Sequence, residues 1–317
     1  MLIDVERLQQ LAAALPPLTF DPAADRFGQD PLAQTYLEFY DLPGADPERG
    51  LVHGFGKLPL GGFDIACHYW LPARAKATLV VVHGYFDHIG YYNHLIDFAL
   101  AQGYGVLAFD LPGHGLSSGE PAAIDRFERY AEVLDALLDA AEPHLPGPLH
   151  AVGQSTGGTT LLIHQWLHRP RFDRVALLAP LLLPKGWALS RITLCLLGRW
   201  MTHVPRVFVP SSHDDDFNHF QAQEDPLQSR QVSVAWVKAM KAWDARFRDL
   251  PDRDKPLLVV QGTGDTVVDW RYNLNQISGK LPNAEIRMID DARHHLVKEL
   301  PIYRDAVFAH LARWLEG

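Results

Sequence analysis

Ser155 lies at the centre of the segment Gly153-Gln154-Ser155-Thr156-Gly157, between two glycines that each stand two residues away. Residues 148–152 are apolar enough to form a short buried strand, and residues 158–167 have the composition of a helix. A G-x-S-x-G segment between a strand and a helix predicts a sharp turn that exposes the serine hydroxyl as a nucleophile. Both glycines are needed because a Cβ at either position would clash with the neighbouring strand or helix. The alternative is an incidental serine in a glycine-rich loop.

Acids and histidines that are able to activate this serine occur later in the chain. A serine hydroxyl is a weak nucleophile, so it needs a base and a group that orients the base. Asp265 lies just past the apolar run 256–261, where an acid at a strand end can reach the site, and the nearby Asp269 is the alternative. The base is expected after the last apolar run, where His294 and His295 are adjacent. This placement fits either histidine, and the order serine, aspartate, histidine is that of a known catalytic triad.

The negative charge that develops on a substrate oxygen needs backbone N–H donors. One donor is expected to be the N–H of Thr156, which follows the nucleophile at the positive end of the predicted helix. The other is expected from the loop that begins His83-Gly84-Tyr85, because Gly84 lets the backbone approach closely. We therefore predict that the N–H groups of Tyr85 and Thr156 form an oxyanion hole.

The elements that must position these residues alternate along the chain. Strands are predicted at 51–58, 63–71, 78–83, 105–110, 148–153, 175–179, 256–261 and 284–289. Helices are predicted at 91–102, 124–141, 158–167, 272–280 and 303–315. The first two strands are expected to form a hairpin at Gly61-Gly62. Because near-continuous apolar strands are separated by helices, we predict an α/β protein with a mostly parallel central sheet and helices on both faces.

Residues 181–255 interrupt this alternation, and the interruption divides the chain into three regions. It is too long for a loop and too short for an independent enzyme domain. We therefore predict a helical cap at 181–255, inserted before the strand that carries Asp265 and lying over the strand ends, where open α/β sheets bind ligands. The core then comprises residues 51–180 and 256–317, and residues 1–50 form an N-terminal extension.

Two apolar stretches within the predicted cap differ in pattern. One has apolar side chains at helical spacing, which is typical of packing onto a core: Val232, Trp236, Met240, Trp243 and Phe247. The other, residues 187–200, is apolar almost all round, which exceeds what one buried face requires. We expect part of it, including Trp187, Leu197 and Trp200, to line an acyl pocket, touch a membrane or form an oligomer contact.

Composition excludes several classes of function. The net charge is −9 and no Lys/Arg stripe is present, so nucleic acid is not an expected partner. Cys67 and Cys195 are expected to be buried free thiols. The N-terminus lacks the pattern of a signal peptide, and the apolar run 177–183 is too short to span a membrane. These features predict a soluble cytoplasmic protein without a transmembrane segment.

No motif for a cofactor or a metal stands out. Gly54-Phe55-Gly56 lacks the rest of a dinucleotide-binding fingerprint. His213-Asp214-Asp215-Asp216 contains metal-ligating residue types, but three consecutive acids cannot all face one ion, so a solvated loop is expected. We predict neither a cofactor nor a metal.

Three further segments carry recognisable motifs. Residues 83–92 begin with His-Gly and continue with an acid, His and Tyr, and residues 110–117 read Asp-x-x-Gly-His-Gly-x-Ser. Both segments resemble those of the α/β-hydrolase superfamily and, within it, the monoacylglycerol lipase/lysophospholipase-like branch, also called serine aminopeptidase S33-like. Asp291-Ala292-Arg293-His294 matches its Gly-Ala-x-His segment with Asp in place of Gly. The resemblance covers about residues 50–317. It implies the α/β-hydrolase fold and selects His294 as the base.

The resemblance implies a serine hydrolase that cleaves carboxylic esters, such as monoacylglycerol-like or lysophospholipid-like lipids, through an acyl-enzyme. Small esters or lipids are then the expected partners, with transient membrane contact through the cap. A short-chain carboxylesterase, thioesterase, acyltransferase or aminopeptidase would use the same triad. Epoxide hydrolases and haloalkane dehalogenases have Asp where Ser155 stands, so they are excluded. A hydrolase-fold binding protein without chemistry remains an alternative, although such proteins usually lack a triad member. No oligomeric state is predicted.

Overall fold

A central eight-stranded sheet organises the computed structural model, which describes residues 3–21, 27, 30–187 and 200–317. The strand order in this sheet is β1-β2-β4-β3-β5-β6-β9-β10. The strands are β1 (Leu51–Leu60), β2 (Phe63–Pro72), β3 (Thr78–Val82), β4 (Gly105–Phe109), β5 (Leu149–Gln154), β6 (Arg174–Leu178), β9 (Leu257–Gly262) and β10 (Ala284–Ile289). β1 and β2 pair antiparallel, β2 is antiparallel to β4, and the remaining pairs are parallel. The predicted α/β architecture with a mostly parallel sheet is confirmed.

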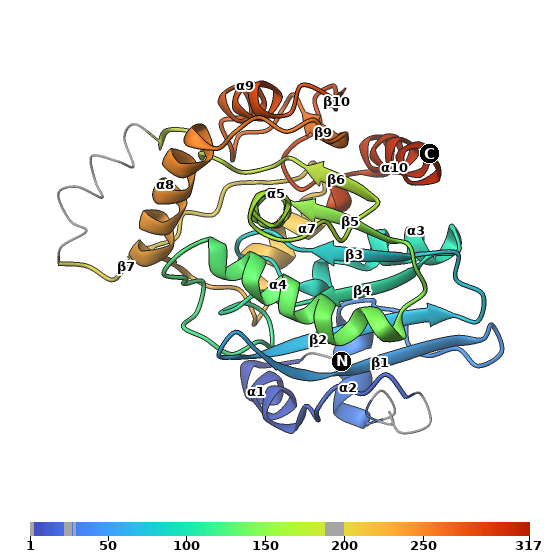
Figure 1. Ribbon diagram of the computed structural model, residues 1–317. Coiled ribbons are helices and arrows are strands. Elements are labelled where there is room, and N and C mark those ends of the chain that lie inside the picture. Colours follow the sequence, from blue (N-terminus) through green and yellow to red (C-terminus); the bar gives the residue numbers. More distant parts are fainter. Residues whose placement is uncertain (1–2, 22–26, 28–29, 188–199) are drawn as a thin grey trace.

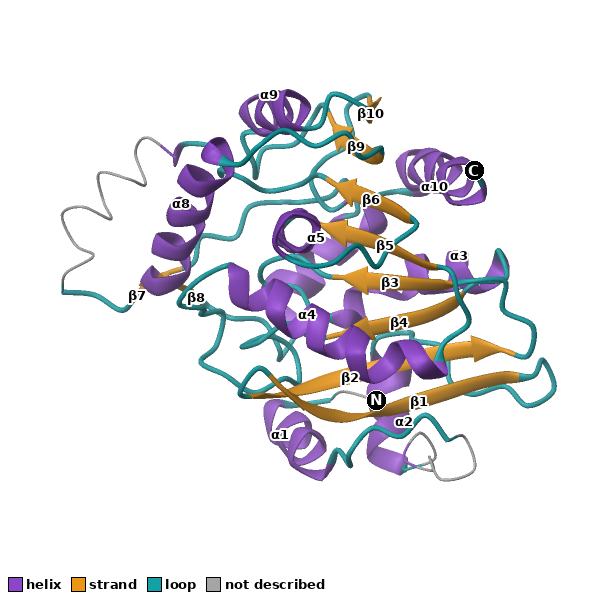
Figure 2. Ribbon diagram, viewed as in Figure 1, coloured by secondary structure: helices purple, strands orange, loops and turns teal. Residues whose placement is uncertain are grey.

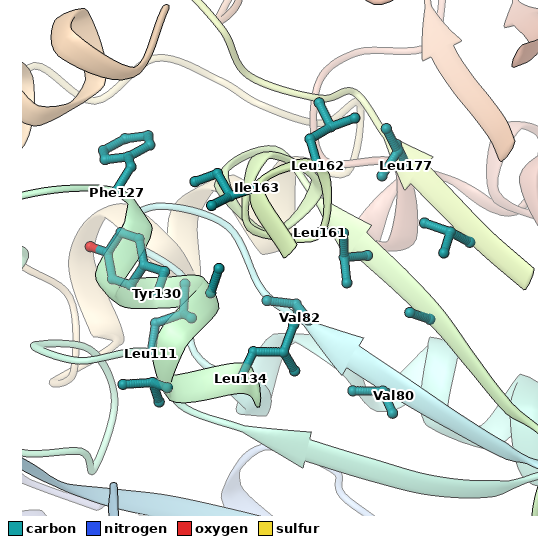
Figure 3. Close-up of a cluster of buried hydrophobic side chains, with 14 of the residues drawn as sticks. Val80, Val82, Leu111, Phe127, Tyr130, Leu134, Leu161, Leu162, Ile163 and Leu177 are labelled. Atoms are coloured by element: carbon teal, nitrogen blue, oxygen red, sulfur yellow. The ribbon is translucent and has the colours of Figure 1, made fainter. Parts of the chain in front are cut away.

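Helices cover both faces of this sheet (Figure 2). The long helices are α1 (Val5–Ala14), α2 (Pro31–Phe39), α3 (Asn93–Ala101), α4 (Glu128–Ala141), α5 (Thr156–Leu167), α8 (Val234–Asp249), α9 (Trp270–Lys280) and α10 (Pro301–Glu316). One hydrophobic cluster joins one sheet face to α4, α5 and α8, and the other joins the opposite face to α2, α3 and α10. Successive residues of β3 alternate between them: Val80 and Val82 face α4 and α5 (Figure 3), whereas Leu79 and Val81 belong to the second cluster.

The predicted hairpin turn between β1 and β2 is present. Leu60 pairs with Phe63, so the loop contains only Gly61 and Gly62, both with positive φ (57° and 85°). Two consecutive left-handed residues match the twist of the flanking strands, and glycine adopts this conformation without steric cost.

The N-terminal extension packs against the first two strands. Leu11 and Tyr36 have no exposed surface and share a hydrophobic cluster with Phe55 of β1 and Trp70 of β2. α2 begins where Asp30 accepts a hydrogen bond from the N–H of Leu32, immediately before a proline at the first helical position. The extension therefore contributes to the main core rather than forming a separate unit.

The described part of residues 181–255 contains β7 (His203–Pro205), β8 (Gln231–Ser233), α7 (Asp215–His219), a π-helical turn (Phe220–Glu224) and α8. Figure 1 shows α8 and β7 beyond the C-terminal ends of the parallel strands, and β8, which is labelled in Figure 2, pairs with β7. The apolar residues of α8 bury their side chains as predicted: Trp236, Met240, Trp243 and Phe247. Val232 does not continue this stripe, because Ser233 caps the helix and leaves Val232 in β8.

Predictions for the two cysteines and for the segment 213–216 can be compared with the structure. Cys67 is a buried free thiol, whereas Cys195 lies outside the described residues. The segment 213–216 was expected to be a solvated loop, and this is wrong in part. Asp214 accepts a hydrogen bond from the N–H of Phe217 and starts α7, because an aspartate at this position satisfies a free N–H of the first turn.

His53 and His68 form a buried pair within the β1–β2 hairpin. Nε2 of His53 lies 3.1 Å from Nδ1 of His68, and the ring of His68 stacks on those of Phe55 and Trp70. Burial lowers the pKa of His53 to about 3 and places that of His68 well below its usual value. Both rings are therefore neutral in the folded protein at pH 7.

The free energy of unfolding should fall as the pH drops below about 6.5. The unfolded chain then binds a proton at His53, which the folded chain does not bind until about pH 3. The substitution His53→Phe removes this difference and should reduce the pH slope by up to about 1.4 kcal/mol per pH unit. Urea unfolding between pH 7 and about 4 measures the slope. His219→Gln, at an exposed position, is the control, and equal slopes in all three proteins would contradict the prediction.

Candidate active site

Ser155 lies in the turn between β5 and α5 with φ 52° and ψ −113°. A positive φ is unfavourable for a serine, so the surrounding packing must hold it. A Cβ on Gly157 would lie 2.0 Å from the carbonyl oxygen of Val82 in β3, and one on Gly153 would lie 2.5 Å from backbone atoms of Gly157. The two glycines thus let α5 start in direct contact with the sheet. Ser155 is thereby placed at the C-terminal edge of β5.

Asp265 and His294 are in direct contact. Nδ1 of His294 lies 2.8 Å from Oδ2 of Asp265, which also accepts from Nε2 of Gln261 at 3.0 Å. Oδ1 of Asp265 accepts from the N–H groups of Val267 and Val268. Each oxygen of the carboxylate therefore has two partners. Asp269, the alternative acid, instead caps α9 by accepting from the N–H of Tyr272.

The pKa values of this pair diverge. Burial raises the pKa of Asp265, but the charge of His294 and the hydrogen bonds outweigh burial, so the net pKa is lowered. Burial lowers the pKa of His294, but the Asp265 carboxylate outweighs that effect and the net pKa is raised. A carboxylate that stays ionised beside an imidazole of raised pKa is the arrangement that a general base requires.

The loop that carries His294 packs closely against the end of β9. A Cβ on Gly262 would lie 2.1 Å from the carbonyl oxygen of Ala292, and one on Gly264 would lie 2.3 Å from that of Asp291. Asp291 has φ 62°, which explains why glycine suits this position. Aspartate is among the few residues that tolerate this conformation. Its N–H donates to Oγ1 of Thr263, so the turn is retained.

Glu299 connects the histidine loop to the region predicted as the cap. It has no exposed surface, and its Oε1 accepts from the N–H of Arg293 at 2.6 Å. Its Oε2 accepts from the N–H of His213 at 2.8 Å and from the hydroxyl of Ser212 at 3.2 Å. Glu299 was not predicted from the sequence. The only local indication is a charged residue shortly after the apolar pair Leu296-Val297.

The loop after β3 places backbone atoms beside Ser155. A Cβ on Gly84 would lie 3.3 Å from Cβ of Ser155. The N–H of Gly84 itself points to Oδ2 of Asp87 (3.2 Å) and to the hydroxyl of Tyr92 (3.1 Å). The next N–H in the loop belongs to Tyr85, whose ring stacks on Trp236 at 3.6 Å between centroids. The Gly84 N–H is thus engaged within the loop, and Tyr85 lines the same cavity as Ser155.

The other motif residues hold this loop in place. Nε2 of His83 accepts from the N–H of Leu111, and its Nδ1 donates to the carbonyl oxygen of Gly84. Asp110 is buried and accepts from the N–H groups of Ile89 and Leu116. These side chains replace the regular backbone hydrogen bonds that irregular loops lack.

A cavity of about 360 Å³ opens over Ser155 and His294. Its lining is mainly apolar and includes Leu181, Trp187, Val209, Trp236, Met240 and Val267. Of the three expected pocket residues, Trp187 lines this cavity, Trp200 is 86% exposed and does not, and Leu197 lies outside the described residues. The size lies within the range of small-molecule sites.

His295 and Asp87 also line the cavity. Nε2 of His295 lies 3.2 Å from Oδ2 of Asp87, so the second histidine pairs with a different acid. Burial raises the pKa of Asp87, but His295 and Tyr92 outweigh it and hold the pKa low. In the described ranges no three His, Cys, Asp or Glu side chains are arranged to hold a metal ion. No described helix is long and apolar enough to cross a membrane.

Comparisons with known proteins agree on one group of relatives. A sequence model of the family described as serine aminopeptidase, S33 matches residues 73–301. The monoglyceride lipase homolog of Monkeypox virus is 27% identical over 260 residues, which cover 79% of this chain and 94% of the viral protein. Phospholipase YtpA of Bacillus subtilis (strain 168) is 29% identical over 221 residues, 66% of this chain and 84% of the relative.

A solved structure has the same fold. A soluble variant of monoglyceride lipase from Saccharomyces cerevisiae, in complex with a substrate analog, superposes with a TM-score of 0.69 at 18% identity. The match covers 82% of this chain and 93% of the yeast chain. The residues matched by the family model begin after β2, so α1 and α2 lie outside them.

The contact between α5 and β3 can be tested with one methyl group. Gly157→Ala should destabilise the protein by more than about 4 kcal/mol, because its Cβ would overlap the Val82 carbonyl. Gly279→Ala in α9 is the matched control, because its Cβ meets no atom within 4 Å, and it should stabilise by up to about 1 kcal/mol. Thermal unfolding measures both changes. A Gly157→Ala protein as stable as wild type would show that α5 can move away from the sheet.

Proposed function

The chain belongs to the serine aminopeptidase S33 family of α/β-hydrolases, and we propose that it is a serine hydrolase that cleaves carboxylic esters of the monoacylglycerol or lysophospholipid type. The proposed nucleophile is Ser155, the base is His294 and the residue that orients the base is Asp265. The observation that carries the proposal is the 2.8 Å contact between His294 and Asp265, in a mainly apolar cavity that Ser155 also lines.

The proposed reaction has two halves. Nε2 of His294 accepts the proton of the Ser155 hydroxyl as Oγ attacks the ester carbonyl carbon, and the negative oxygen is held by the N–H groups of Tyr85 and Thr156. His294 then gives the proton to the departing alcohol, which leaves an acyl-enzyme. Water attacks this ester with His294 again as base, so the carboxylic acid and free Ser155 are released. Asp265 keeps the imidazole in the required tautomer throughout.

A lipid substrate is supported by the surfaces around the cavity. Its side chains are mostly apolar, which suits an acyl chain more than a peptide. Val207 and Val209 line the cavity and are also exposed to solvent, by 81% and 47%. Trp200 and Met201, in the same part of the cap, are exposed as well. Exposed apolar side chains at a cavity mouth favour contact with a lipid surface during substrate entry. The relatives named as monoglyceride lipase and phospholipase support the same class.

An aminopeptidase is a second candidate, because of Asp87. This carboxylate lines the cavity, is 6% exposed, and has a pKa held below its usual value. A buried anion near the nucleophile is what a substrate ammonium group would need. Oδ2 of Asp87 already accepts hydrogen bonds from the Gly84 N–H and the Tyr92 hydroxyl, and Nε2 of His295 lies 3.2 Å away. The aminopeptidase is therefore supported less well than an esterase with an apolar acyl site.

Ester hydrolysis can be measured with p-nitrophenyl esters from acetate to palmitate, followed by a monoacylglycerol and a lysophospholipid. We expect kcat/KM to rise with chain length as the acyl group fills the cavity, and Ser155→Ala to lower it at least 10⁴-fold, in line with the loss of a triad member. Activity on short esters alone would indicate a carboxylesterase. Hydrolysis of amino-acid p-nitroanilides instead of esters would favour the peptidase. Full activity in Ser155→Ala would contradict the mechanism.

The two adjacent histidines provide a matched comparison. His294→Ala should abolish ester hydrolysis, because no base then faces Ser155, whereas His295→Gln should retain activity within about tenfold of wild type. Labelling by a fluorophosphonate probe and steady-state kinetics report the difference. Loss of activity in His295→Gln with retention in His294→Ala would reverse the assignment.

A further inference from the structure

Asp225, at the end of the π-helical turn in the cap region, is a buried carboxylate with no part in the proposed chemistry. Its side chain has no exposed surface. Oδ1 accepts from the hydroxyl of Tyr40 at 2.8 Å and from the N–H of Leu227 at 2.9 Å. Oδ2 accepts from Nε2 of His88 at 2.9 Å and from the hydroxyl of Tyr91. A buried charge is tolerated only where such donors replace water, so all four contacts matter to its position.

The three side-chain donors come from two parts of the chain, both remote from Asp225. Tyr40 follows α2 in the N-terminal extension, and His88 and Tyr91 lie in the loop after β3. The N–H of Gly90 donates to Nδ1 of His88, so this nitrogen accepts and Nε2 carries the proton given to Asp225. The ring of Tyr40 lies edge-on to that of His88, with 4.7 Å between the ring centroids. A Cβ on Gly90 would lie 2.6 Å from Cγ of Tyr40. The extension therefore packs directly on this loop.

A chain of hydrogen bonds runs from Asp225 towards the proposed oxyanion hole. Nε2 of Gln228 donates to the hydroxyl of Tyr91 at 2.7 Å and to the carbonyl oxygen of Phe86 at 2.6 Å. Phe86 has φ 65°, a conformation that a phenylalanine adopts only when its surroundings hold it. The residue before it is Tyr85, whose N–H is the proposed oxyanion donor. Relaxation of Phe86 would move that N–H.

We propose that Tyr40, in the N-terminal extension, is a positioning residue: through Asp225, Tyr91 and Gln228 it holds Phe86, and with it the Tyr85 N–H, in the geometry that stabilises the oxyanion. This inference rests on the proposed serine-hydrolase function. It assigns a role in the active site to a segment that the family model does not match. Tyr40 touches no reacting atom and would act only through the Tyr85 N–H. Because that N–H would stabilise an oxyanion that develops in the transition state, loss of the Tyr40 contact should lower kcat and not weaken substrate binding.

The variant Tyr40→Phe tests this role, because it keeps the ring and removes only the hydroxyl that Asp225 accepts. Tyr36→Phe is the matched control: Tyr36 lies four residues earlier, within α2, is fully buried, and its hydroxyl has no hydrogen-bond partner among the described residues. Concentrations of active protein are set by fluorophosphonate titration, so partial unfolding of a variant does not imitate a catalytic loss.

Tyr40→Phe should lower kcat on a p-nitrophenyl ester about tenfold, a fraction of what loss of a whole oxyanion donor costs, and change KM less than about twofold. The affinity for a trifluoromethyl ketone, which presents an oxyanion, should fall by the same factor as kcat/KM, while the affinity for the product carboxylate stays constant. Gln228→Met, which breaks the series of hydrogen bonds at its other end, should show the same pattern. Tyr36→Phe should match wild type in every measurement.

Two results would overturn the inference. One is a Tyr40→Phe protein that equals Tyr36→Phe in kcat and in ketone affinity, and the other is a rise in KM at constant kcat. The proposed function is tested separately, by whether a fluorophosphonate labels Ser155 of wild type at all. If it labels Ser155 but no ester is cleaved, the labelling rate, which needs the same N–H donors, replaces kcat in the comparison. If it does not, both proposals fail.

Discussion

The close approach of α5 to β3 is the constraint on which the candidate site depends. Gly157 sits so near Val82 that a methyl group would overlap the carbonyl oxygen, and Ser155 takes a positive φ just before the helix begins. This contact brings the first turn of α5, the end of β5 and the loop after β3 to one point. The strained serine persists because packing on both sides leaves it no room to relax. Every other group in the site is placed relative to that turn.

Buried carboxylates hold the loops that surround the turn. Asp110 fixes the segment after β3, Asp265 fixes the loop after β9, and Glu299 connects the histidine loop to Ser212 and His213. Asp225 likewise connects its own segment to Tyr40 in the N-terminal extension. Each accepts at least one backbone N–H, and Asp225 also accepts from three side chains; these donors offset the cost of burying the charge. Rigidity at this edge thus comes from charged side chains rather than from regular secondary structure.

The features that could be predicted from the sequence are those that a local residue pattern encodes. The sheet, the hairpin and the elbow follow from periodicity and glycine spacing, and all predicted strands end within two residues of those observed. Some local signals were present but overlooked, such as Asp30-Pro31 before α2 and Asp214 before α7. Glu299 and Asp225 could not be found this way, because their partners are remote. Tyr40 and Asp225 are 185 positions apart, and no period or motif links them.

The geometry of the candidate site depends on these contacts between remote segments of the chain. The side-chain donors to Asp225 from the loop after β3 are 134 and 137 residues away, and the third side-chain donor comes from the extension. Closing a loop of this span costs conformational entropy, and packing elsewhere in the fold must offset that cost. Local opening of the cap region would expose the carboxylate and release Gln228 from Phe86. In the proposed mechanism, the geometry of the loop that carries the Tyr85 N–H is therefore set by remote contacts, those of the extension included, and not by the elbow alone.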